Sequence, residues 1–243
     1  MTRSSELLAS AITGQPLHPV LGDTAAGGNF SKYNEEKAPI SPFHCVDGNF
    51  SELQESPLSR PETIRILEAT WLLVESVLHS DGLTILGEKS ARNYYRARTA
   101  ILESPEIALL KETKDYIYQC CRLTATLLLN AAESHLPLGS GVKNRPIVRQ
   151  LEHNLKFAEL PTSWGVFRGV YFNVILVGTA ASLGMSTNGY FRNLVGSSMG
   201  YYACGVWAGA EQPVVMLKRF QDLYRGKKAP LFSLNPPRSQ PSS

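Results

Sequence analysis

Apolar residues at helical spacing in the middle of the chain restrict its fold more than any other feature. One wide apolar stripe comprises Tyr116, Ile117, Cys120, Leu123, Thr124, Leu127, Leu128 and Ala131. A recurrence every three or four residues places such side chains on one side of an α-helix. A second run, Val170 to Met185, is apolar almost all round. Its length of about 16 residues is below the roughly 20 of a membrane span, so a buried helix and no membrane contact are expected.

Capping signals predict the neighbouring helices. The first should start near Ser59, as N-cap, with Pro61 in the first turn and Glu62 as the capping-box acid, and end at Gly82. Further helices are expected at 89–103, over a segment from Ser104 to His135 with a break near 111–114, at 146–155, at 164–183, at 188–202, and from Pro213 to Gly226. No alternation typical of strands occurs, so the fold class predicted is all-α.

Composition divides the chain into three parts. Residues 1–59 are rich in Gly, Pro, Ser and Asn with irregularly placed apolar residues, which favours a mobile N-terminal arm. Residues 60–226 are predicted to form a single irregular multi-helix domain. Residues 227–243 are basic and rich in Pro and Ser, as in disordered tails.

Charge and cysteines narrow the function classes. The formal net charge is only +3 and Lys and Arg are not concentrated in any segment, so sequence-specific DNA binding is not expected. The N-terminal segment is too short and polar for a secretory signal, which predicts an intracellular protein, nuclear or cytoplasmic. Cys45, Cys120, Cys121 and Cys204 lack the spacing of zinc ligands, and no metal or other cofactor is expected.

Two roles are open for the central cysteines. Cys120 falls on the apolar stripe and is most simply a small buried residue. Cys121 is followed by Arg122, which could lower a thiol pKa, and His135 or His153 could then serve as a base. Because no catalytic spacing supports this arrangement, packing is favoured and no catalytic residue is assigned.

Polar residues within apolar helices are the candidates for a site. Glu75 and Arg122 are expected to form an internal ion pair, because buried charges need partners. The alternative is that they line a ligand cavity between helices, with His153 and Tyr171 as further polar groups. The candidate ligand-binding residues are therefore Glu75, Arg122, His153 and Tyr171.

The segment Tyr118-Gln119-Cys120-Cys121-Arg122-Leu123-Thr124-Ala125 resembles the regulatory domain of fungal binuclear zinc-cluster transcription factors. The order of later parts is similar as well: the loop at Pro137, an R-x-L helix at 149–151, the apolar helix at 169–182, Tyr190-Phe191, and a closing helix with Phe220. The resemblance covers about residues 60–225. The chain departs from the family in lacking the six-cysteine zinc cluster, since one cysteine precedes position 120.

The resemblance implies a regulatory or interaction domain without its own DNA-binding cluster. Its partners would be proteins of the transcription machinery or a small hydrophobic effector, and it could form a homodimer. The alternative hypothesis is a metal-independent protein of fungal secondary metabolism that binds a hydrophobic metabolite and promotes its cyclisation or isomerisation. Whether the chain is an enzyme is left open, with a non-catalytic role favoured.

Overall fold

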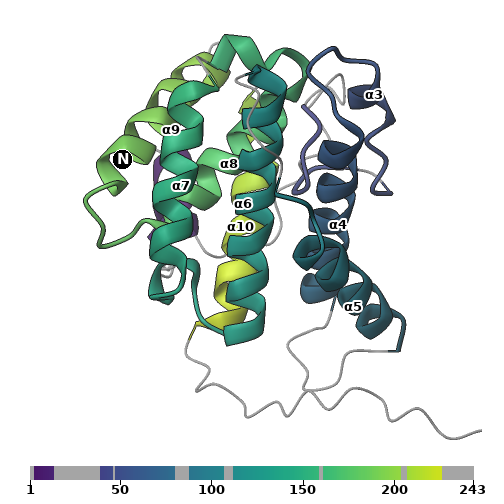
Figure 1. The fold of residues 1–243 in the computed structure, drawn as a ribbon. Helices are drawn as coiled ribbons and strands as arrows, with labels where there is room; N and C mark the ends of the chain where they lie inside the picture. The colour runs from purple at the N-terminus through teal and green to yellow at the C-terminus, as the bar shows by residue number, and fades with distance from the viewer. Residues whose placement is uncertain are drawn as a thin grey trace, which may run out of the picture.

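The computed structural model describes residues 3–13, 39–45, 47–79, 88–106, 112–158, 161–203 and 207–225. Throughout these ranges the regular structure is helical, apart from an isolated bridge between Ser41 and His44. The prediction of an all-α fold is thus confirmed. In chain order the helices are α1 (Arg3–Thr13), α3 (Ser51–Gln54), α4 (Pro61–Leu78), α5 (Glu88–Leu102), α6 (Thr113–Ser134), the 3₁₀ helix η2 (Leu138–Ser140), α7 (Asn144–Phe157), the 3₁₀ helix η3 (Pro161–Phe167), α8 (Arg168–Ala181), α9 (Asn188–Ala203) and α10 (Trp207–Tyr224) (Figure 1).

Helix α8 is the centre of the bundle. Every residue from Gly169 to Ala181 is buried, and α1, α6, α7, α9 and α10 all contact the helix. A helix that is apolar all round requires such cover on every side. The single helix predicted for 164–183 is divided in two, because η3 contains a kink at Gly165, whose φ of 47° favours glycine.

Helix α6 lies between α8 and the pair α4 and α5, and it also contacts α7 (Figure 1). Its predicted apolar stripe is buried, and Cys120 and Cys121 both lie within the core. The helix ends at Ser134, next to the predicted end. There His135 takes a left-handed φ of 54°, and its N–H donates to the carbonyl oxygen of Ala131.

Helix α4 begins one residue later than predicted. Its N-cap residue is Arg60 and not Ser59, and Pro61 takes the first helical position. The Arg60 guanidinium donates to the carboxylate of Asp115, which is fully buried in the first turn of α6. This ion pair joins the starts of α4 and α6, so the two helices run in the same direction. The predicted end at Gly82 lies outside the described residues.

Part of the predicted arm belongs to the core. Leu7 and Ala11 of α1 are buried against α10 and α8, and Phe43, Phe50 and Leu53 are buried in the same core. The expectation that residues 1–59 lie outside the packed domain is therefore wrong for 3–13, 39–45 and 47–58. These apolar side chains are too widely and irregularly spaced to give a periodic signal over the whole segment, although Leu7 and Ala11 are four residues apart on one helix face.

Two backbone contacts show how closely these N-terminal segments are joined to the bundle. The side-chain amide of Gln221 in α10 donates to the carbonyl oxygens of Ala11 and Ile12, at 2.8 and 3.0 Å. A Cβ atom placed on Gly169 of α8 would lie 2.6 Å from the Pro39 carbonyl oxygen. Segment 39–45 therefore crosses the start of α8 at a distance that only glycine permits.

The last helix differs from its predicted form. Helix α10 begins at Trp207 and contains Pro213, which the sequence pattern predicts at the start. Proline at an interior position lacks the N–H that would bond one turn back, so a start signal was expected there. The predicted tail, 227–243, lies outside the described residues.

Candidate functional site

The four predicted site residues lie on four different helices. Glu75 is on α4, Arg122 on α6, His153 on α7 and Tyr171 on α8. Glu75 and Arg122 are half-buried, Tyr171 is 3% exposed, and His153 is on the surface. Within the described part of the chain no hydrogen bond or ion pair joins any two of them.

The predicted ion pair between Glu75 and Arg122 does not form. Glu75 instead lies 3.0 Å from Nδ1 of His79, and Arg122 donates to Gln119 at 3.1 Å and to Glu106 at 3.2 Å. The reason is the register of the two helices. Counted from the Arg60–Asp115 ion pair that aligns the two helices, Glu75 lies 15 residues further along the chain and Arg122 seven. The difference of eight residues corresponds to an offset of roughly 12 Å along the helix axes.

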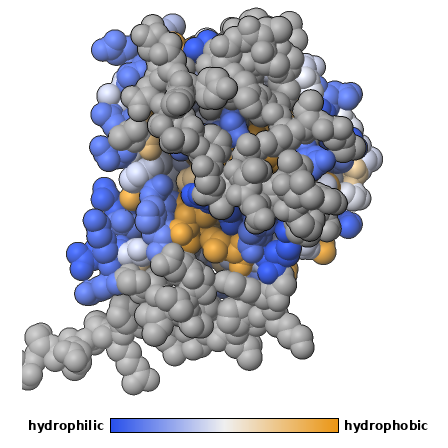
Figure 2. All heavy atoms as spheres, turned by 180° about the vertical axis from the view of Figure 1, so that it is seen from behind, coloured by the Kyte–Doolittle hydropathy of each residue, from blue (hydrophilic) through white to orange (hydrophobic). Residues whose placement is uncertain are grey.

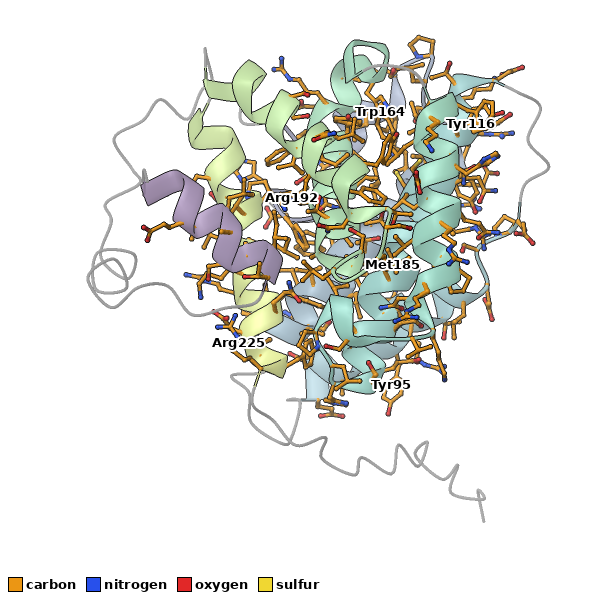
Figure 3. All side chains as sticks on the ribbon, turned by 90° about the vertical axis from the view of Figure 1, so that its left-hand side faces the viewer. Tyr95, Tyr116, Trp164, Met185, Arg192 and Arg225 are labelled. Atoms are coloured by element: carbon orange, nitrogen blue, oxygen red, sulfur yellow. The ribbon has the colours of Figure 1, made fainter. Side chains whose placement is uncertain are left out.

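Tyr171 lies in an aromatic part of the interior. Its ring centroid is 5.2 Å from that of Trp164, which is fully buried toward the same end of the bundle as Tyr116 (Figure 3). Burial raises the pKa of Tyr171 to about 12. Among the described residues, neither Nε1 of Trp164 nor Oδ1 of Asn173 has a hydrogen-bond partner. Buried polar atoms without a partner are rare in folded proteins, and a polar atom of a ligand or a water molecule could supply the missing hydrogen bond.

The central thiols have the properties of packing residues. Cys120 and Cys121 are 0% and 3% exposed. Burial raises the pKa of both thiols, Cys120 being further affected by its neighbour Cys121. Arg122 makes its contacts with Gln119 and Glu106. Because the thiolate is the reactive form, these thiols are protonated at neutral pH and poor nucleophiles.

The outer side of α7 carries a continuous row of exposed side chains. Arg145, Arg149, His153 and Phe157 are spaced four residues apart and are all exposed, whereas Val148, Leu151 and Leu155 on the other side are buried. Four-residue spacing places side chains in one line along a helix. Helix α7 lies on the outside of the bundle next to α6 (Figure 1). We call this line, together with Val142 and Lys143 before the helix, the α7 face.

An aromatic cluster forms the C-terminal end of the α7 face. The Phe157 ring stacks on Tyr116 of α6, with centroids 5.5 Å apart and an interplanar angle of 16°. The His153 ring lies 4.8 Å from the Phe157 ring. Phe157 is 50% exposed although it is a large apolar residue, while Tyr116 beneath it is 8% exposed. The cluster therefore presents an aromatic surface held by packing.

The α7 face is basic. It includes Lys143, Arg145 and Arg149, none of which makes an ion pair within the described residues. Lys156, beside the face, pairs with Glu152 at 2.7 Å and lies 5.2 Å from the centroid of the Tyr190 ring. From the sequence alone, no concentration of cations is expected. The spacing of 145, 149, 153 and 157 was visible in the sequence, but its meaning depended on knowing which side of α7 is covered.

Other features of the described surface are less distinctive. A half-open polar hollow of about 330 Å³ at the start of α4 is lined by Gln54, Ser59, Arg60, Pro61, Ile64, Arg65 and Glu68. Seen from behind, apolar side chains gather in the middle of the face, between hydrophilic ones (Figure 2). The described ranges hold no group of three or more potential metal ligands.

One helical stretch among the described residues, Trp164–Ala181, is long and apolar enough to cross a membrane by length and composition alone. It is 83% buried inside the bundle, where the core helix of a soluble protein would pass the same test. This stretch is weak evidence for a membrane span.

Comparisons with known proteins add no family. No family model matches the sequence, and neither the curated proteins nor the solved structures searched give a significant match.

Proposed function

We propose that the protein is a regulatory interaction domain related to those of fungal zinc-cluster transcription factors, acting through protein partners. The observation that carries this proposal is the α7 face, where unpaired arginines and a stacked aromatic cluster lie in one exposed line. Arginine and aromatic residues are enriched at protein interfaces and dominate their binding energy.

The arrangement of the resembling segments supports the same proposal. The segment around Cys120, the R-x-L segment at 149–151 and the apolar segment at 169–182 lie on α6, α7 and α8, and these three helices contact one another. Segments that were compared only by their order along the chain are thus neighbours in space. The function proposed with them implies a nuclear location during regulation and no sequence-specific DNA contact by this chain.

A reporter assay tests the proposed function. The protein is fused to a DNA-binding domain from another protein, and transcription from a promoter carrying its sites is measured. We expect a several-fold change in transcription relative to the DNA-binding domain alone. A fusion that is expressed, folded and nuclear but leaves transcription unchanged would contradict the proposal.

A second candidate function rests on two buried polar atoms without a hydrogen-bond partner among the described residues. The unpartnered atoms of Trp164 and Asn173 are polar groups in an apolar surrounding, as in sites for hydrophobic metabolites. A small hydrophobic effector, or a substrate for cyclisation, would be held beside one of these atoms by shape and a hydrogen bond. Thermal shift measurements with a panel of hydrophobic metabolites test this candidate. A rise in melting temperature that Asn173→Leu abolishes would support this candidate function. If none of the compounds raises the melting temperature, the compounds of the panel are excluded as ligands.

A further inference from the structure

We infer that the α7 face binds an acidic protein segment that carries a bulky apolar side chain at one end. This inference rests on the proposed function, because it names the kind of partner that the interaction domain takes. Arg145 and Arg149 form the charged part of the face, His153 follows them, and Phe157 forms the apolar end. From Arg145 to Phe157 the face is about 18 Å long, which matches three turns of a partner helix.

The charge of the face is directed outward. Within the described residues Arg145 and Arg149 have no carboxylate partner, and they lie one helical turn apart in line with the exposed Phe157 ring. The carboxylate of Glu152 is already bound by Lys156. The face therefore attracts anions, and a partner with carboxylates spaced four residues apart would meet both arginines at once.

The apolar end requires a second kind of group. Phe157 is 50% exposed, and its ring is fixed against Tyr116 and close to His153. A pre-formed aromatic surface accepts an aromatic or aliphatic side chain at little entropic cost. At the other end of the face Val142 is 73% exposed.

These apolar ends favour a protein segment over a nucleic acid. A nucleic acid presents phosphates along its whole length, and its affinity comes mainly from many cationic contacts. The α7 face offers few cations, and apolar groups lie at both ends of their row. Binding of duplex DNA is therefore measured alongside binding of the peptides.

Binding is measured by fluorescence anisotropy with two labelled helical peptides of about 15 residues. Each has glutamates four apart on one face and a single tryptophan, placed at the N-terminal end in one peptide and at the C-terminal end in the other. We expect one of them to bind with a dissociation constant on the order of 100 µM and to weaken as salt is added.

Three variants locate the site. Arg145→Glu with Arg149→Glu should weaken binding about tenfold, and Phe157→Ala about fivefold. The matched control is Arg92→Glu with Arg96→Glu, because these exposed arginines of α5 give the same change in net charge on another helix. The control should alter binding by less than about twofold. Circular dichroism verifies that each variant is folded.

Several results would overturn the inference. They are no binding of either peptide at about 1 mM, equal weakening by both double variants, or tighter binding of a random-sequence duplex DNA than of the peptides. The reporter assay separates the two proposals. If the wild-type fusion changes transcription but the Arg145→Glu/Arg149→Glu fusion does so equally, the inference fails and the function stands. If the peptides bind as expected but no fusion changes transcription, the proposed function is contradicted and the inference about the α7 face stands.

Discussion

Replacing Phe43 by alanine tests whether the N-terminal segment is part of the fold. Phe43 is 2% exposed and belongs to the same core as α4, α6 and α8. Truncation of a buried phenylalanine to alanine lowers the free energy of unfolding by about 3–5 kcal/mol, through lost transfer energy and the cavity left behind. For a domain of this size that loss lowers the melting temperature by roughly 6–20 °C.

The assay is thermal and urea unfolding followed by far-UV circular dichroism. Phe157→Ala is the matched control, since it removes the same atoms from a ring that is 50% exposed. That change loses the stacking contact with Tyr116 and part of the burial, about 1–2 kcal/mol. Deletion of residues 1–58 should be more harmful than Phe43→Ala, because it also removes Phe50 and Leu53 from the core.

A melting temperature of Phe43→Ala within about 1 °C of the wild type would refute this reasoning. It would mean that segment 39–45 is not held against the bundle in solution and that the folded domain begins near residue 60. The close contact between Gly169 and the Pro39 backbone offers an independent check. Gly169→Ala should destabilise by about 1–3 kcal/mol if the segment is in place, and have little effect if it is not.

Three further outcomes follow from the charges and thiols of the core. Cys121 should resist iodoacetamide at pH 8 in the native protein, because burial raises the pKa of its thiol, and it should become alkylated in denaturant. Peptide mass mapping measures the labelling, and labelling of the native protein would show that the segment opens. Arg60→Ala should cost about 3–5 kcal/mol, because it removes the guanidinium that pairs with the buried carboxylate of Asp115; an unchanged urea midpoint would contradict this. The free energy of unfolding should fall as the pH rises above about 10, because tyrosines of the unfolded chain ionise there while Tyr94 and Tyr171, whose pKa values burial raises to about 12, stay neutral in the folded protein. Each of the two tyrosines lowers stability by up to about 1.4 kcal/mol per pH unit. Tyr94→Phe should therefore flatten the dependence of the urea midpoint on pH.

Helices with a strong apolar period could be predicted from the sequence alone. The stripe beginning at Tyr116 and the apolar run after Val170 became α6 and α8, the two helices with the most complete burial. Helix boundaries that are set by tertiary contacts could not be predicted from the sequence. The cap at Arg60 depends on Asp115, which is 55 residues away, and α10 continues through Pro213.

Isolated apolar residues were the main source of error. Phe43 and Phe50 lie among Gly, Pro, Ser and Asn, and such composition is typical of segments that bury too little surface to repay the entropy of ordering. They are buried here because the bundle offers apolar surface to this part of the chain: Pro39 and Ile40 lie against Gly169 of α8, and Gly48 lies against Trp71 of α4. A single sequence shows how much apolar surface a segment has, but not how much surface the rest of the fold offers to it.

The candidate site shows the same dependence on covered and uncovered surfaces. His153 was selected as a polar group for a cavity between helices, yet it lies on the outside of α7, next to Phe157. Arg145 and Arg149 were not selected, because a cation on a helix is normally a solvated residue. They become candidates only because α6 and α8 cover the opposite side of α7, so that these cations, His153 and the Phe157 ring share one free side. The property that distinguishes the α7 face is therefore the combination of charge and a stacked aromatic end, which arises from packing between α6 and α7 and has no counterpart in either segment alone.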